Sequence, residues 1–175
     1  NYPYGDSEAF VLEPILATRY QTPPHFRTLL RDWFEKALRA STARWKVATH
    51  HHPVLEDRYP LVISDFVALY EEYGVDLVLV GHHHNYLRSW PLTKNEPDLD
   101  SGITYVQLGG GGGNLGDRPR TPDLRWAKTY QGYGYSIISI LEDRLDYKMY
   151  DDNGAVRDSF NLVKRGRSSA KLEGA

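Results

Sequence analysis

Hydrophobic residues along the chain follow two different spacings, and together these spacings predict an α/β domain. Between Pro23 and Arg39 they recur every three or four residues, which is the spacing of one apolar helix face. Short apolar or β-branched runs over Ala9–Leu12, Trp45–Thr49 and Val75–Val80 predict strands. A second amphipathic stretch lies between the last two strands, and Gly74 is placed to cap it as a helix C-terminus.

Two histidine triplets directly follow two of the predicted strands. His50–His52 follow Trp45–Thr49, and His82–His84 follow Val75–Val80 after one glycine; the triplets contain six of the seven histidines. A strand, a helix and a strand within about 35 residues have the length of a βαβ unit, whose strands are parallel. Because parallel strands end on the same side of a sheet, we expect both triplets to meet in one crevice at its carboxyl edge.

The spacing within the second triplet favours a metal site. If the backbone stays extended after the strand, His82 and His84 face one site and His83 faces away. Neutral imidazole nitrogens bind Zn, Fe or Mn-type ions, whereas an isolated histidine is usually a hydrogen-bonded structural residue. In the first triplet, alternation leaves open whether the middle histidine or the outer two face the site.

The carboxyl-terminal part of the chain has a different pattern. A strand over Ile103–Leu108 leads into the glycine run Gly109–Gly113. Tyr135–Leu141, Leu145–Tyr150 and Val156–Val163 are then separated by short turns, which predicts an antiparallel meander. This meander either continues the first sheet or forms a second sheet packed on it.

Composition narrows the class of protein. The 175 residues are 41% hydrophobic and 13% aromatic, which is typical of a globular domain. We expect one domain over residues 1–165 and a disordered tail over 166–175. The net charge of −2 argues against a nucleic-acid partner, and the absence of cysteine excludes disulfides and thiolate metal sites. No apolar run has the length of a membrane span.

Two segments resemble motifs of a known family. GHHHNYLRSW, from Gly81 to Trp90, resembles the Gly-His-x-His motif of the calcineurin-like metallophosphoesterases, and its longer form is similar to the branch that contains purple acid phosphatases. WKVATHHHP, from Trp45 to Pro53, resembles the preceding motif, a strand that ends in His-x-Pro. The glycine run and the phrase VRDSF are also similar, so the resemblance extends from about Tyr2 to about Val163.

The resemblance implies a fold, a reaction and a set of ligands. The fold is a four-layer αββα sandwich, of which this chain is the carboxyl-terminal half. The reaction is hydrolysis of phosphate monoesters or diesters by two metal ions (Fe, Zn or Mn), which lie about 3.5–4 Å apart and clamp the phosphate. Carried over to this sequence, His51 and His82 ligate one ion and His84 ligates the other. Phosphatases of this kind are often exported, so the resemblance also favours an extracellular or periplasmic location.

The sequence departs from the family in its first half. The D-x-H, GDxx(D/Y) and GNH(E/D) motifs, which supply most carboxylate and amide ligands, are absent. Asp6 follows a glycine but no apolar strand, so we do not assign it as a ligand. Leu87 stands where purple acid phosphatases usually carry a glutamate. We therefore expect that the missing amino-terminal half is needed for activity and that the chain alone is inactive. We also expect that helix Pro23–Arg39 and strand Val75–Val80 lack part of their apolar cover. Such exposed apolar surface would make the chain prone to aggregation and marginally stable.

Other readings of the sequence remain open. The chain can be a non-catalytic metal-binding or interaction module in which the histidines hold one structural ion. An iron oxygenase would need a carboxylate placed with two histidines, and no such spacing is apparent. We interpret Gly109–Gly113 as a flexible loop beside the site rather than a phosphate-binding loop. We interpret Arg88 as a structural or solvated side chain rather than a phosphate contact. Asp98 and Asp100 are interpreted as solvated surface residues.

Overall fold

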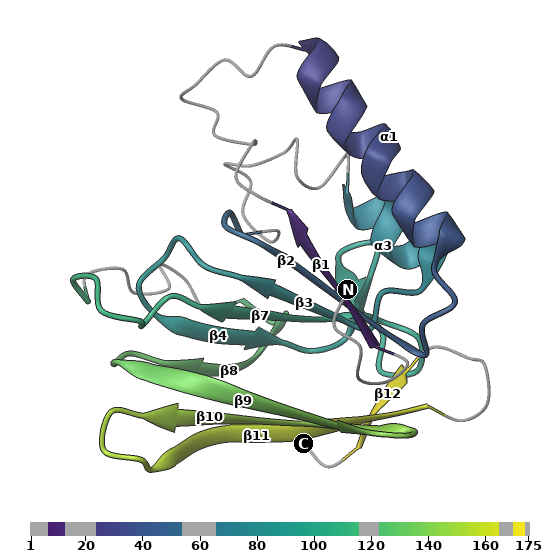
Figure 1. Ribbon diagram of the computed structural model, residues 1–175. Coiled ribbons are helices and arrows are strands. Elements are labelled where there is room, and N and C mark those ends of the chain that lie inside the picture. Colours follow the sequence, from purple (N-terminus) through teal and green to yellow (C-terminus); the bar gives the residue numbers. More distant parts are fainter. Residues whose placement is uncertain (1–6, 13–23, 54–65, 116–122, 165–169, 174–175) are drawn as a thin grey trace.

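Two stacked β-sheets carry helices on one outer face (Figure 1). The computed structural model describes residues 7–12, 24–53, 66–115, 123–164 and 170–173. The helices are α1, Pro24–Ala40, and α3, Ala68–Tyr73. The predicted helix Pro23–Arg39 is thus confirmed almost residue for residue, and the carboxyl-terminal turn of the second predicted helix is confirmed as α3.

The first sheet has the strand order β1-β2-β3-β7-β4-β8. Strands β1, β2, β3 and β7 are parallel to their neighbours in this order, while β4 is antiparallel to both β7 and β8. The parallel pairing of the two strands that precede the histidine triplets confirms the βαβ prediction. The bounds are β1, Ser7–Leu12; β2, Trp45–His50; β3, Leu77–Val80; β4, Tyr86–Ser89; β7, Thr104–Leu108; and β8, Trp126–Tyr130.

The antiparallel meander forms a second, separate sheet with the order β12-β11-β10-β9. Its strands are β9, Gly134–Leu141; β10, Arg144–Asp151; β11, Val156–Lys164; and β12, Ala170–Glu173. Strand β12 corrects one expectation, because it lies within the predicted disordered tail and pairs with β11. Backbone hydrogen bonding to an available sheet edge outweighs the weak local signal of this segment. A small antiparallel hairpin of β5, Leu92–Thr93, and β6, Glu96–Pro97, lies between β4 and β7 in the chain.

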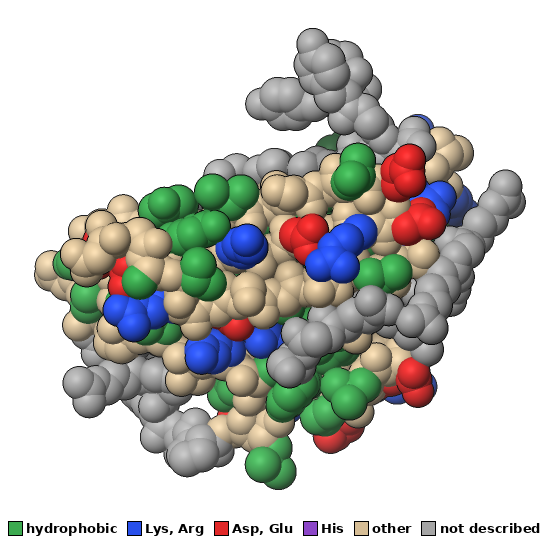
Figure 2. All heavy atoms as spheres, turned by 90° about the horizontal axis from the view of Figure 1, so that it is seen from below, with side chains coloured by type: hydrophobic (Ala, Val, Ile, Leu, Met, Phe, Trp, Pro, Cys, Tyr) green, Lys and Arg blue, Asp and Glu red, His purple; other side chains and the backbone are tan. Residues whose placement is uncertain are grey.

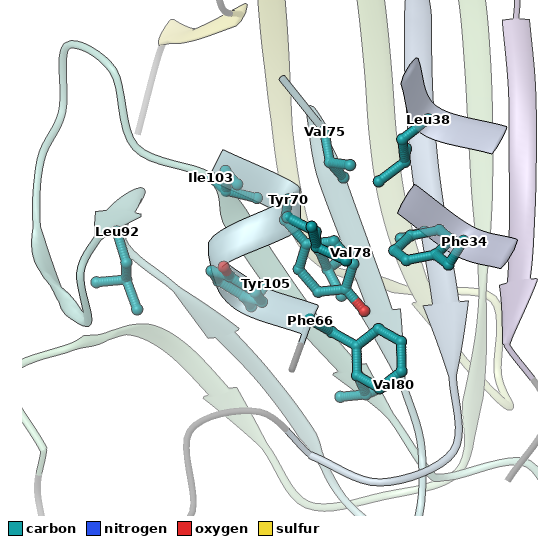
Figure 3. Packing of buried hydrophobic residues seen from close by; sticks show 12 residues of the cluster. Phe34, Leu38, Phe66, Tyr70, Val75, Val78, Val80, Leu92, Ile103 and Tyr105 are labelled. Carbon is teal, nitrogen blue, oxygen red and sulfur yellow. The ribbon is translucent and has the colours of Figure 1, made fainter. Parts of the chain in front are cut away.

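The helices pack on the first sheet through a cluster of buried aromatic and aliphatic side chains (Figure 3). Phe34 of α1 contacts Phe66 and Tyr70, with ring centroids 5.8 Å apart in both pairs. Val78 of β3 lies beneath these rings. Gly74 ends α3 in the left-handed conformation, with φ 66°, as predicted for a C-cap. This packing holds the helices on β3, which leads through Gly81 into the second histidine triplet.

The two sheets pack face to face through a second apolar cluster. Trp45, Leu77 and Tyr86 of the first sheet meet Tyr147 and Phe160 of the second. The Trp45 indole also donates a hydrogen bond of 2.8 Å to the carbonyl oxygen of Glu142, in the turn between β9 and β10. The described layers are thus helix, sheet and sheet, which confirms the α/β two-sheet prediction; the fourth layer is not among the described residues.

The expected gap in apolar cover is present on α1 but not on β3. Leu29 and Trp33 of α1 are 62% and 51% exposed, whereas Leu77 and Val78 of β3 are fully buried. Strand β3 is covered because it lies in the middle of the sheet, between β2 and β7, with helices on one face and the second sheet on the other.

The outer face of the second sheet mixes exposed apolar and charged side chains (Figure 2). Its exposed apolar residues include Tyr135, Ile137 and Leu141 of the edge strand β9, and Val156 of β11. None of the described helices is long and apolar enough to cross a membrane.

Candidate metal centre

His51 and His82 lie in contact at the carboxyl edge of the parallel strands. Nε2 of His51 is 3.2 Å from Nδ1 of His82. The backbones also meet, because the Gly81 N–H donates a hydrogen bond of 3.0 Å to the carbonyl oxygen of His51. The two triplets therefore converge from strands β2 and β3, as the parallel topology predicts.

The second triplet does not continue the strand. The His83 N–H donates to the carbonyl of Gly81 at 2.9 Å, and the Asn85 N–H donates to the carbonyl of His83 at 2.8 Å, which are two successive tight turns. His82 has a positive φ of 70°, which is uncommon for a residue other than glycine. The extended backbone assumed from the sequence is therefore wrong, and alternation does not decide where these side chains point.

Four imidazole rings gather around this turn. The ring centroids are 5.1 Å apart for His51 and His52, 4.9 Å for His52 and His82, 5.2 Å for His51 and His82, and 5.0 Å for His82 and His83. The cluster thus includes His52 and His83, to which the family resemblance assigns no role.

His84 is held differently from His51 and His82. Its Nδ1 lies 2.8 Å from the carbonyl oxygen of Asn114, and its ring packs against Gly113 in the glycine run. Among the residues that the structure describes, no group of three or more His, Cys, Asp or Glu side chains is arranged to hold a metal ion. The structure thus brings His51 and His82 together, whereas the third predicted ligand, His84, contacts Gly113 and Asn114.

The environment of His50 and His52 favours neutral imidazoles. Burial lowers the pKa of His50 to about 4, and its ring stacks on Tyr70 with centroids 6.2 Å apart. Burial, followed by repulsion from His82, lowers the pKa of His52 to about 4. A neutral imidazole is the form that binds metals. His50 is nevertheless buried against Tyr70 of α3, so it is part of the core.

The separation of the His51 and His82 nitrogens fits two ligands of one ion. With metal–nitrogen bonds of about 2.0–2.1 Å, two imidazole nitrogens on the same ion lie about 2.9 Å apart at a right angle and about 3.4 Å apart at a tetrahedral angle. The observed 3.2 Å lies between these values. The same distance also suits a hydrogen bond in which one ring donates to the other.

The strand after the histidine turn is fixed to the second sheet by a buried polar network. The Arg88 guanidinium donates to both carboxylate oxygens of Asp158, at 2.7 and 3.2 Å, and the Tyr86 hydroxyl donates to Asp158 at 2.7 Å. Arg88 therefore forms a buried structural ion pair, which confirms the structural interpretation of this residue. Sequence reasoning missed Asp158, although it lies in the VRDSF phrase that resembles the family.

The other candidates take structural positions or lie outside the described residues. Leu87 is buried in β4, and the carboxylate of Asp98 caps a turn by accepting hydrogen bonds from the N–H groups of Asp100 and Ser101. Asp6 lies outside the described residues. The chemistry of the described site thus depends on imidazoles.

Comparison with a family model and with curated proteins gives consistent results. Residues 4–86 match the model of the calcineurin-like phosphoesterases, a span that includes both triplets. The chain is 26% identical over 121 residues to a protein of Arabidopsis thaliana named Probable inactive purple acid phosphatase 27. That match covers 62% of this chain but 20% of the relative, so the chain corresponds to about a fifth of that protein's length.

Comparison with solved structures supports the same fold. The purple acid phosphatase PPD1 from yellow lupin seeds superposes with a TM-score of 0.75 at 20% identity, over 94% of this chain and 32% of that protein. GAP50 of Plasmodium, described as the anchor in the inner membrane complex, superposes with a TM-score of 0.68 at 12% identity, over 91% of this chain and 50% of that protein.

Proposed function

We propose that this chain, a calcineurin-like metallophosphoesterase of the purple acid phosphatase type, supplies the histidine ligands of a phosphoester-hydrolysing metal centre. In the proposed centre His51 and His82 hold one ion, and His84 contributes to a second. The single observation that carries the proposal is the 3.2 Å separation of His51 Nε2 and His82 Nδ1, which suits two ligands of one ion.

In this proposal each part of the chain has a defined role. Strands β2 and β3 bring the imidazoles of His51 and His82 together, with one ring nitrogen of each facing the other. Bound metal ions of this family polarise the phosphate and activate water for in-line attack. The substrate class is phosphate monoesters or diesters.

The proposed centre also requires ligands from another polypeptide segment. The sequence lacks the carboxylate and amide motifs of the family's first half, and the described site offers imidazoles where two ions need several further ligands each. We therefore propose that this chain alone does not turn over substrate and that it works as part of a longer domain. An exported location rests on the resemblance alone.

A metal titration of the chain tests the ligand assignment. We expect Zn²⁺ to bind, and we expect His51→Ala and His82→Ala each to weaken binding by more than the roughly 10–100-fold typical of residues that only support a ligand. His25→Ala is the matched control, because it removes the one histidine outside the two triplets and should leave the affinity unchanged. Equal affinity in all four proteins would contradict the assignment.

An activity assay tests the need for further ligands. We expect the chain, supplied with Mn, Fe or Zn, to release no nitrophenol from nitrophenyl phosphate. Robust turnover by the isolated chain would show that the proposed missing ligands are not required.

A second candidate function is a non-catalytic module that binds metal or a partner. It is favoured by relatives that bear the word inactive in their names and by the likeness to a protein described as an anchor. The longer protein discriminates the two candidates. Two bound ions with turnover support the hydrolase, whereas one ion without turnover supports the module.

A further inference from the structure

The glycine run after β7 packs closely around the histidine turn. The Gly109 N–H donates a hydrogen bond of 3.0 Å to the carbonyl of Asn85, and a side chain at position 109 would collide with the backbone carbonyl of His83. A side chain at position 110 would come within 2.5 Å of the carbonyl of Gly132. Part of this run is therefore a packed segment, rather than the flexible loop that its composition suggests.

The end of the run meets the ring of His84. A Cβ atom at position 113 would lie 2.5–2.9 Å from Cε1, Nδ1 and Nε2 of the imidazole, which is closer than real Cβ contacts come. The next residue, Asn114, places its carbonyl oxygen 2.8 Å from His84 Nδ1. The absence of a side chain at Gly113 is thus what lets the ring reach this carbonyl.

The hydrogen bond to Asn114 determines where the proton of His84 resides. A carbonyl oxygen only accepts hydrogen bonds, so Nδ1 of His84 must be the donor. In a neutral imidazole one nitrogen carries the proton and the other carries the lone pair. The lone pair of His84 is therefore on Nε2.

His51 and His82 lack this constraint on their facing nitrogens. These nitrogens contact each other, and either one can donate to the other. The hydrogen bond to Asn114 thus sets the proton position of His84, whereas the contact between His51 and His82 leaves the proton positions of their facing nitrogens open. Metal-binding histidines typically donate their second ring N–H to a carbonyl or carboxylate in this way.

We propose that the segment Gly109–Asn114 is a backbone clamp that holds His84 in the Nδ1–H tautomer and presents Nε2 as the ligand nitrogen. Gly113 and Asn114 are in this view positioning residues that act through His84. The metal ion as the partner of Nε2 rests on the proposed function, whereas the tautomer of His84 does not.

Nitrogen NMR of the metal-free chain, labelled with ¹⁵N-histidine, tests the clamp directly. Long-range proton–nitrogen correlations distinguish a protonated ring nitrogen from one with a lone pair, and His84→Gln identifies the signals of His84. Measured well above the usual imidazole pKa of about 6.5, His84 should show a protonated Nδ1 and a lone pair on Nε2. A protonated Nε2 in the unaltered chain would overturn the proposal.

Two alanine variants in the same run provide a matched comparison. Gly113→Ala should displace the ring and shift His84 toward the Nε2–H form that free neutral histidine favours. Gly111→Ala should leave the tautomer unchanged, because a Cβ atom there meets nothing within 4 Å. A Gly113→Ala spectrum identical to that of Gly111→Ala would also overturn the clamp. If Gly113→Ala does not fold, the tautomer of the unaltered chain still decides the question.

The experiment separates failure of the clamp from failure of the proposed metal centre. A protonated Nδ1 in a chain that binds no Zn²⁺ would support the clamp and contradict the metal centre. A protonated Nε2 in a chain whose Zn²⁺ binding depends on His51 and His82 would contradict the clamp and leave the metal centre supported.

Discussion

Arg88 of β4 and Asp158 of β11 form a buried ion pair that joins the two sheets behind the histidine turn. Both side chains are 5% exposed, and the guanidinium also lies over the ring of Phe160, 4.8 Å from its centroid. Tyr86, two residues after His84, donates to the same carboxylate. Asp158 of the second sheet therefore anchors two side chains of β4, the strand that directly follows the histidine turn.

Replacing this aspartate should be strongly destabilising. Asp158→Ala leaves the Arg88 charge buried without its partner, and loss of one partner of a buried pair typically costs about 3–5 kcal/mol. The control is Asp146→Ala, which breaks the exposed pair with Arg144 and should cost about 1 kcal/mol or less. Urea unfolding of the three proteins measures both effects, and similar losses in the two variants would contradict the buried role.

A double replacement separates the penalty of the unpaired charge from the value of the pair. In Arg88→Met with Asp158→Leu neither charge remains, so much of the stability lost in Asp158→Ala should return. A double variant as unstable as the single one would instead show that packing around Tyr86 and Phe160 dominates.

Acid should weaken the turn between β10 and β11 through Asp151. The Ala155 N–H, together with Arg157 and the Asn153 N–H, lowers the pKa of the Asp151 carboxyl below its ordinary value of 3.8. Because the folded pKa lies below the unfolded pKa, this contribution to stability is present above pH 3.8 and is lost as the pH falls through the folded pKa.

Removing the charge of Asp151 should make the free energy of unfolding depend less on pH in acid. We expect the free energy of unfolding of Asp151→Asn to fall less steeply between about pH 5 and pH 2 than that of the unaltered chain. Asp152→Asn, at the exposed neighbouring residue, is the control and should retain the original slope. Parallel curves for all three proteins would show that Asp151 does not carry this dependence.

Two glycines should differ in their tolerance of alanine. Gly74→Ala forces a side chain into the left-handed conformation but meets no atom within 4 Å, so it should cost about 1–2 kcal/mol. Gly109→Ala should cost more, since it places Cβ against the backbone carbonyl of His83 and the backbone cannot move aside without disturbing the turn. Thermal unfolding with both variants checks the order, and a reversed order would contradict the packed arrangement around His83.

Some of the predicted elements depended on local physics and were confirmed. The apolar spacing of α1, the glycine cap after α3 and the meander of β9 to β11 are each set by neighbouring residues in sequence. The convergence of the two histidine triplets also followed from the sequence, because a βαβ unit of this length requires parallel strands that end at one edge.

Other elements formed where the local pattern gave a weak or opposite signal. Strand β8 lies in a segment for which the apolar pattern predicts no strand, and β12 lies in the predicted disordered tail. Each is a short strand that pairs along one neighbour at an edge of its sheet. The backbone hydrogen bonds of each strand are made to that neighbour. The local sequence of the strand therefore does not reveal the pairing.

The sequence by itself determined that two histidine triplets follow parallel strands, since apolar periodicity and chain length fix that topology. Only the tertiary structure decided which rings meet. The backbone turns after Gly81, His82 takes a positive φ, and the glycine run holds His84 against Asn114. These outcomes depend on contacts between segments about thirty residues apart, and the hydrophobic pattern does not encode such contacts.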